Sequence, residues 1–262
     1  MNPNLSTDPW QMLKSFTAAR IALGRVGSSL PTQEILDFGC AHALARDAVH
    51  RPLDVGALDA QLQLQGFRTL QVNSQASGRD EYLLRPDLGR RLSIEACAAL
   101  SEPTLPQDLL FVVGDGLSSL AVERHVVPLL AQIIQLAPSD WRMDTVVIAT
   151  QARVTLGDEI GALLQAKMVL MMVGERPGLS SPDSLGLYLT HNPKIGRNDA
   201  ERNCISNVRP EGLNYPAAAH KLVWLAQQAM RHQVTGIGLK DESDVQLHNA
   251  NEVSTEQQLI GQ

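Results

Sequence analysis

The residues most able to take part in chemistry lie in turns that each follow a short apolar run. In residues 167–178, an apolar run leads into a turn that holds two glycines, a proline, Glu175 and Arg176. Such a run is typical of a strand buried on both faces of a parallel sheet. A charged glycine turn after such a strand is where α/β proteins bind ligands, and Gly174 and Gly178 would let the backbone approach one.

Two more stretches have the same form, and together the three predict one ligand-binding edge. Residues 109–113 lead into Gly114-Asp-Gly-Leu-Ser118, and residues 145–149 lead into Thr150-Gln-Ala-Arg-Val154. Helical patterns separate the strands, so right-handed crossovers would place the turns along one edge of a sheet. The polar side chains gathered there would be Asp115, Arg153, Glu175, Arg176 and Ser206. The alternative is that these are only the tight turns of any doubly wound domain.

These side chains suit the binding of a polar ligand by hydrogen bonds better than covalent catalysis. The chain contains no P-loop, no GxGxxG fingerprint, no GxSxG nucleophile elbow and no HExxH motif, and its histidines are too dispersed to form a metal site by spacing. Asp158 and Glu159 are adjacent on a predicted helix and point in different directions, so they are not an acid and base pair. Cys204 has no activating neighbour in the sequence, and packing at the start of a strand is the alternative to reactivity.

Composition argues against several classes of protein. The 262 residues allow one large domain or two small ones, and the apolar runs are too short to span a bilayer. The start of the chain lacks the basic stretch and apolar core of a signal peptide, and the three cysteines are scattered, so we expect a reduced cytosolic protein. A net charge of −6 and 4% aromatic residues argue against nucleic-acid binding.

Hydrophobic periodicity predicts an α/β fold, in which a Rossmann-like parallel sheet domain follows a mainly helical N-terminal segment with a small hairpin. In the N-terminal segment, residues 1–105, we predict helices over 9–16, 32–50, 54–66 and 93–100, and a hairpin of 68–72 with 81–84. In the domain of residues 106–240, we predict strands over 109–113, 145–149, 167–173, 204–208 and 235–239. The predicted helices of that domain cover 117–136, with a break or kink at Pro128, and 157–166, 184–189 and 216–233. Residues 241–262 form a polar tail without periodicity, for which we predict disorder.

The residues alone therefore leave two functions open. An α/β domain with a ligand-binding edge and no catalytic set of its own suits a cofactor-binding subunit whose partner carries out the chemistry. The same features suit a small-molecule sensor.

Several motifs resemble those of one family, the small (light, or β) subunit of ethanolamine ammonia-lyase. The motifs in the second half are Gly114-Asp-Gly-Leu-Ser118, Arg153-Val154, Gly174-Glu-Arg-Pro-Gly-Leu179 and Cys204-Ile-Ser-Asn207. In the first half, His42-Ala-Leu-Ala-Arg-Asp47 and Arg85-Pro-Asp-Leu-Gly-Arg-Arg91 are also similar to that family. The resemblance covers residues 8–239, which is nearly the whole chain.

The resemblance implies an adenosylcobalamin-dependent lyase that converts ethanolamine to acetaldehyde and ammonia by a radical mechanism. The catalytic barrel of that enzyme belongs to the large subunit, and the small subunit has a Rossmann-like domain and helps to hold cobalamin at the interface between the two. By the family pattern, no catalytic residue falls on this chain, and its cobalamin contacts fall on Val154, Glu175 and Cys204.

Cobalamin would be bound base-on by this chain. The sequence has no Asp-x-His-x-x-Gly motif, whose imidazole replaces the cofactor's own base on cobalt in many cobalamin domains. We therefore expect no metal ligand from this chain, and the cobalt chemistry is left to the cofactor. The resemblance implies a cytoplasmic hetero-oligomer. Some family members are targeted to a bacterial microcompartment by an extended N-terminal segment. That segment is short here, so the resemblance leaves this localisation open. A stand-alone ligand-binding or regulatory α/β protein is the alternative function.

Overall fold

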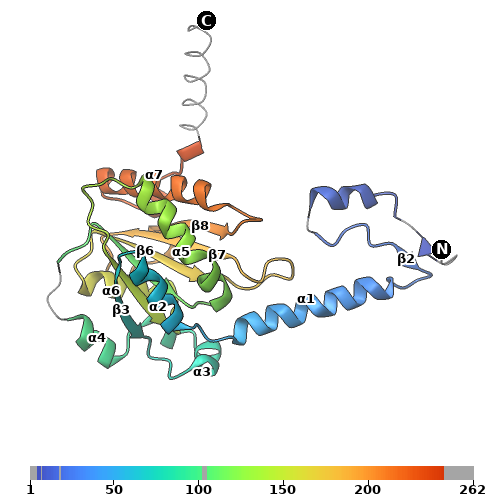
Figure 1. Cartoon of the computed structure of the whole chain (residues 1–262), viewed down its shortest axis with the longest axis horizontal. Coiled ribbons are helices and arrows are strands. Elements are labelled where there is room, and N and C mark those ends of the chain that lie inside the picture. Colours follow the sequence, from blue (N-terminus) through green and yellow to red (C-terminus); the bar gives the residue numbers. More distant parts are fainter. Residues whose placement is uncertain (1–4, 7, 18, 102–104, 245–262) are drawn as a thin grey trace, which may run out of the picture.

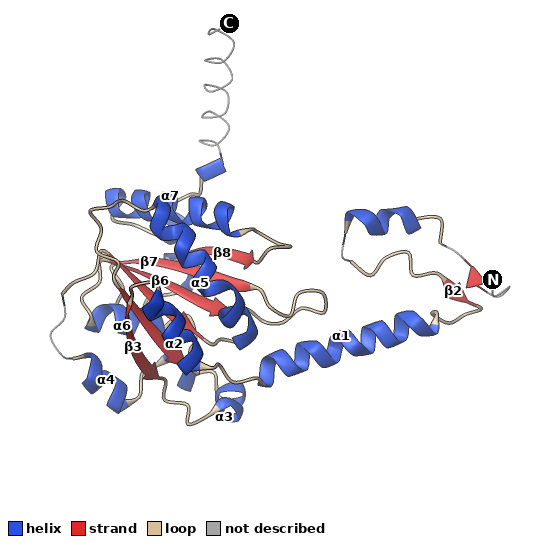
Figure 2. Ribbon diagram, viewed as in Figure 1, coloured by secondary structure: helices blue, strands red, loops and turns tan. Residues whose placement is uncertain are grey.

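A six-stranded sheet forms the centre of the molecule in the computed structural model, which describes residues 5–6, 8–17, 19–101 and 105–244. The strand order is β3-β5-β4-β6-β7-β8. The bounds are Arg68–Asn73 for β3, Leu109–Gly114 for β4, Thr145–Thr150 for β5, Met168–Gly174 for β6, Leu185–His191 for β7 and Asn203–Val208 for β8. Figure 1 and Figure 2 show the helices packed around this sheet.

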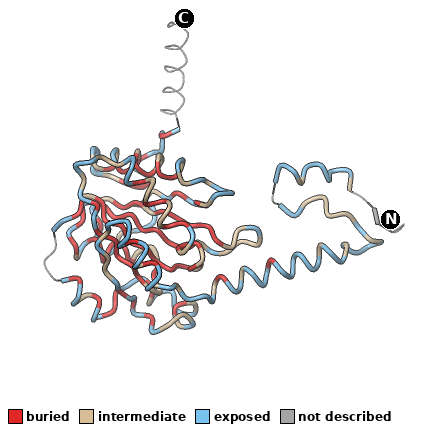
Figure 3. Tube along the Cα trace, viewed as in Figure 1, coloured by how far each residue is buried: buried red, intermediate tan, exposed pale blue. Residues whose placement is uncertain are grey.

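The sheet is mostly parallel, and its central strands are buried on both faces. β3, β5, β4 and β6 run parallel, β7 is antiparallel to β6, and β8 is antiparallel to β7. Every residue of β4 and β6 is buried, which is what a continuous apolar run requires. Figure 3 shows this burial concentrated on the strands. The predicted α/β class and the mostly parallel sheet are confirmed.

Helices cover the two faces of the sheet with separate apolar cores. One core holds α2 (Val55–Leu64), α5 (Ser119–Leu136) and α7 (Tyr215–His232) against the strands. The other core holds α4 (Ile94–Leu100) and α6 (Leu156–Leu163). On this second face the side chains of Cys204 and Ser206 in β8 remain exposed, so the outer part of the sheet is open there.

An N-terminal arm precedes the sheet. It consists of residues 8–17 and 19–50 and contains η1 (Gln11–Phe16), β2 (Arg25–Val26) and α1 (Thr32–His50). β2 pairs with β1 (Leu5–Ser6). Figure 1 shows α1 extending away from the sheet and carrying the other arm elements at its far end.

Three of the predicted elements are wrong, and the first two involve the central sheet. Residues 79–84 form a short helix, α3 (Arg79–Leu84), so the hairpin with residues 68–72 does not exist. Instead, β3 pairs over its whole length with β5. β3 is therefore an edge strand of the central sheet, although it belongs to the segment that we predicted as a separate N-terminal part. The segment predicted as a helix over 184–189 is β7, which pairs with β6 along seven residues. In each case long-range strand pairing overrides a short local pattern.

Smaller differences concern helices and the chain end. α5 continues through Pro128 as one helix, so the proline does not split it. Residues 236–238 form a 3-10 turn, η4 (Gly236–Gly238), in place of the predicted last strand. The remaining short turns are η2 (Leu88–Arg90) and η3 (Asp199–Glu201). The tail predicted to be disordered lies, from residue 245 on, outside the described residues. Across the part of the chain that the structure describes, helices fall short of the length and apolarity needed to cross a bilayer.

Candidate functional site

A pocket of about 400 Å³ lies at the carboxyl edge of the sheet, where the turns after β4, β5 and β6 meet. Its lining includes Tyr82, Gly116, Arg153, Val154, Glu175 and Tyr188. The three turns after β4, β5 and β6 do share one edge, as their strand order requires. Arg176 also lines the pocket, but Asp115 lies beneath it and Ser206 lies outside its lining.

Asp115 ties two of the turns together. Its carboxylate, 1% exposed, accepts hydrogen bonds from the backbone N–H groups of Gln151 and Ala152, both at 3.0 Å. It also accepts one from Nη1 of Arg79 at 3.2 Å. Asp115 therefore fixes the turn after β5 relative to the turn after β4, and it is a structural residue beneath the pocket.

The glycines of these turns serve close packing of the backbone. A Cβ on Gly174 would collide with the carbonyl group of Ser118, and a Cβ on Gly116 would collide with the carbonyl oxygen of Gly174. Gly116 also has a φ of +57°, which disfavours other residues. A Cβ on Gly178 would lie 2.9 Å from Oγ of Ser181. Gly174 and Gly178 therefore make room for other parts of the chain, and not for a ligand as we expected.

Tyr82 lies between two arginines at one side of the pocket. The guanidinium carbon of Arg153 is 4.4 Å from the centre of its ring, and that of Arg79 is 5.2 Å from it. Burial raises the pKa of Tyr82, so the hydroxyl stays protonated and donates to the carbonyl oxygen of Ala152 at 3.0 Å. The stack holds Arg153, and with it the adjacent Val154, at the rim of the pocket.

Unsatisfied polar atoms gather around the same site. Nη2 of Arg79, Nε of Arg153 and Oγ1 of Thr155 are buried without a hydrogen-bond partner among the described residues. Of these three residues, only Arg153 lines the pocket, and all three atoms are covered by the chain itself. An acceptor in the pocket would meet Nε of Arg153 only after that side chain turns toward it.

Glu175 reaches across the sheet from the end of β6 to β8. Its Oε2 accepts the backbone N–H of Asn207 at 3.1 Å. Between them lies Gly186 of β7, where a Cβ would stand 3.1 Å from both Cγ and Oε1 of Glu175. The glycine therefore leaves the path that the Glu175 side chain follows. Oε1 has no hydrogen-bond partner among the described residues and is free to accept from a ligand.

Of the three predicted cobalamin contacts, Val154 and Glu175 line the pocket, and Cys204 does not. Cys204 is exposed on β8 and pairs in register with Tyr188 of β7, whose side chain does line the pocket. Burial, followed by the neighbouring Cys204, raises the pKa of Tyr188. The Cys204 thiol lies 3.4 Å from the hydroxyl of Ser206. Cys204 therefore lies beyond Tyr188, on the open face that continues the pocket.

The sequence did not lead us to expect Tyr82, Tyr188 and Arg79 at this site. Both tyrosines fall in segments whose secondary structure was predicted wrongly, and Arg79 precedes Tyr82 on α3. Alternation of apolar residues in 185–189 was an available signal for a strand, which would have put Tyr188 on the face opposite Leu187 and Leu189. No local signal pointed to α3.

The other charged groups have structural roles. Asp158 accepts two hydrogen bonds from Arg202, at 2.6 and 2.8 Å, and Glu159 accepts two from Arg91, at 3.0 and 3.1 Å. The two acids therefore bind different arginines, in keeping with side chains that point in different directions from one helix. Within the described residues, no three His, Cys, Asp or Glu side chains come together as a metal site.

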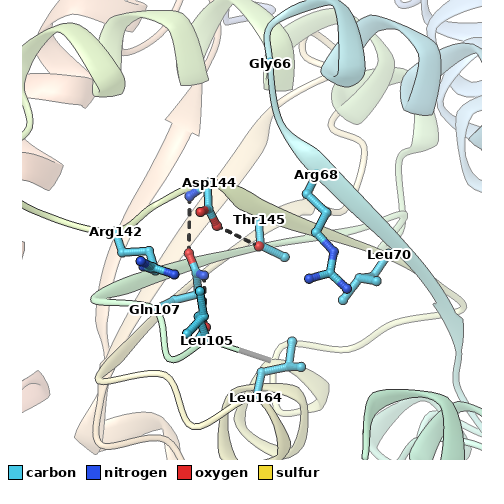
Figure 4. A pocket seen from close by; sticks show the side chains of 9 residues that line it. All are labelled: Gly66, Arg68, Leu70, Leu105, Gln107, Arg142, Asp144, Thr145 and Leu164. Carbon is cyan, nitrogen blue, oxygen red and sulfur yellow. Dashed lines mark hydrogen bonds between the residues drawn. The ribbon is translucent and has the colours of Figure 1, made fainter. Parts of the chain in front are cut away.

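A second hollow, of about 290 Å³, lies at the amino edge of the strands. Figure 4 shows Arg68 and Arg142 on opposite sides of it, with Asp144 between them. Its polar groups bind one another, since Oε1 of Gln107 accepts the N–H of Asp144 at 3.2 Å and Thr145 donates to the Asp144 carboxylate at 2.9 Å.

The pocket at the carboxyl edge can thus hold a polar ligand through arginine donors and the Glu175 acceptor, with the tyrosine rings as apolar contacts. It contains no nucleophile hydrogen-bonded to a base among the described residues. The arrangement supports binding and orientation of a polar ligand.

Comparison with known proteins gives consistent matches over most of the chain. The family model described as ethanolamine ammonia-lyase light chain (EutC) matches residues 7–240. An ethanolamine ammonia-lyase small subunit from Pseudomonas fluorescens (strain Pf0-1) is 55% identical over 244 residues, covering 91% of this chain and 89% of the relative. One from Ralstonia nicotianae is 51% identical over 251 residues, covering 94% and 93%. One from Xanthomonas campestris pv. campestris is 54% identical over 242 residues, covering 90% and 89%.

Proposed function

This chain belongs to the ethanolamine ammonia-lyase light chain family, and we propose that it helps to hold adenosylcobalamin base-on at the interface with the catalytic large subunit of that lyase. The reaction of the complex would be the conversion of ethanolamine to acetaldehyde and ammonia. The observation that carries the proposal is one pocket at the carboxyl edge of the sheet, lined by Arg153, Arg176 and Glu175, whose Oε1 is free to accept.

The residues present fit the nucleotide side of cobalamin, which carries a phosphate and amide groups. Arg153 and Arg176 line the pocket, and their guanidinium groups would donate to phosphate or carbonyl oxygens. Glu175 would accept from an amide N–H, and Val154 beside Arg153 would give an apolar contact. When bound, cobalamin supplies the radical chemistry of the lyase.

Cys204 would extend the contact beyond the pocket. It lies with Ser206 on the open face of β8, next to the Tyr188 ring. A flat sheet face with an exposed thiol and hydroxyl can lie against the edge of a large planar ligand that the pocket holds by its polar side. No metal ligand is needed from this chain, because base-on binding leaves cobalt to the cofactor.

The test is co-expression with the large subunit, followed by an adenosylcobalamin-dependent assay of acetaldehyde formed from ethanolamine. We expect activity only when both chains and the cofactor are present. If the chains fail to associate, or if activity is the same without this one, the lyase role is refuted. A stand-alone ligand-binding protein would instead bind its ligand without a partner.

A further inference from the structure

The N-terminal arm carries an unusual share of exposed apolar surface. On α1, the side chains of Ile35, Leu36, Phe38 and Leu44 are all exposed, and Phe16 of η1 is 83% exposed. Only Ala41 and Ala48 are buried on that helix. So many exposed apolar side chains on one element indicate an interaction site in a folded protein.

The apolar residues of α1 surround the helix. A helix turns by about 100° per residue, so Leu36, Leu44 and Phe38 lie at about 100°, 180° and 300° from Ile35. Charged residues lie between these apolar groups, among them Glu34, Asp37, Arg46 and Asp47, so the exposed apolar groups of α1 are spread around the helix and not gathered on one stripe. A second copy paired along one stripe would leave most of them in water, whereas a partner that contacts α1 on more than one side would cover more of them.

The arm has a defined structure before it meets any partner. Nζ of Lys14 in η1 donates to Oε1 of Glu34 in α1 at 3.2 Å. The guanidinium carbon of Arg20 lies 5.5 Å from the ring centre of Phe38. These contacts hold the first part of the arm against α1, so the exposed apolar groups belong to one ordered surface.

The arm leaves the body of the protein beside the candidate site. Nε of Arg79 donates to the carbonyl oxygen of Val49, in the last turn of α1, at 2.8 Å. The same guanidinium binds Asp115 and the carbonyl oxygen of Gly116, at 3.2 and 2.7 Å. The root of the arm and the floor of the pocket are therefore joined by one side chain, so a partner that closes the pocket also meets the arm.

We propose that the arm is the main docking element of this chain for the large subunit, which contacts α1 on more than one side. This inference rests on the proposed function, because it takes the large subunit as the partner that faces the pocket. The apolar groups around α1 supply the hydrophobic core of the interface, and the adjoining pocket supplies its polar part.

The test compares two double variants in co-purification with the large subunit. Leu36→Arg with Leu44→Arg places charges on exposed positions of the arm, at 62% and 55% exposure. The control, Leu64→Arg with Ile237→Arg, makes the same change at positions 86% and 91% exposed, off the arm. We expect the arm variant to bind about 30-fold more weakly or worse, since buried anchors dominate affinity, and the control to bind within about twofold of the unaltered chain.

Three results would overturn the proposal. In the first, the arm variant binds the large subunit as tightly as the control does. In the second, the arm variant changes only the self-association of this chain alone, which would identify a second copy as the occupant. In the third, the unaltered chain fails to bind the large subunit, which refutes the proposed function itself. Circular dichroism of both variants verifies that each is folded, as exposed positions predict.

Discussion

Removal of the Glu175 carboxylate should weaken cobalamin binding. In the structure, Oε2 accepts the N–H of Asn207 and Oε1 is free on the pocket side. The Glu175→Ala substitution therefore removes one internal hydrogen bond and one acceptor for a ligand. The two losses affect different quantities, the free energy of unfolding and the dissociation constant of the cofactor.

The size of the effect follows from the exposure of the side chain. A hydrogen bond to a charged group contributes about 1.5–3 kcal/mol, which corresponds to about 10- to 150-fold in a dissociation constant. Because Glu175 is only half-buried, solvent weakens the interaction, and the lower end of the range, about tenfold, is expected. The hydrogen bond to Asn207 is exposed, so its loss should lower the free energy of unfolding by no more than about 1 kcal/mol.

The assay is a titration of the reconstituted two-subunit enzyme with adenosylcobalamin, with urea denaturation of this chain in parallel. Glu175→Gln is the matched control, because its amide oxygen can still accept from Asn207 while the negative charge is lost. We expect Glu175→Gln to lie between Glu175→Ala and the unaltered enzyme. Equal affinity of the Ala variant and the unaltered enzyme would refute the assignment. A loss of affinity fully restored by Gln would reassign Glu175 to positioning β8.

Further predictions concern stability. Gly174→Ala should lower the free energy of unfolding by about 3 kcal/mol in urea denaturation, because its Cβ meets the Ser118 backbone, whereas Gly39→Ala, with open space around it, should not destabilise. Tyr82→Phe should cost about 1 kcal/mol for the lost hydrogen bond to Ala152, and an unchanged midpoint would contradict this. Burial lowers the pKa of His125 from its usual 6.5, so its contribution is complete above pH 6.5 and is lost as the pH falls towards the folded-state value. Urea denaturation at pH 7.5 and 5.5 should show this loss, and the loss should shrink in His125→Gln.

The sequence by itself determined the elements whose residue pattern is compatible with only one kind of structure. Residues 109–113 and 168–173 are apolar without interruption, and only strands buried on both faces place such runs away from water. The start of α7 was equally readable, because Asn214 accepts from Ala217 as an N-cap and Pro216 stands in the first turn. The turn after residues 168–173 followed, and with it Glu175 at the ligand-binding edge.

Only the tertiary structure decided the short elements and the groups brought together across the sheet. β3 is a strand because it pairs with β5, which lies far away in the sequence. β7 is a strand because the chain reverses direction after β6 and pairs with it. The arginine pair around Tyr82 and the reach of Glu175 to Asn207 likewise join separate segments. Local propensity fixes a backbone only where it exceeds the free energy of long-range contacts, so a short, mixed segment takes the form that its distant neighbours stabilise.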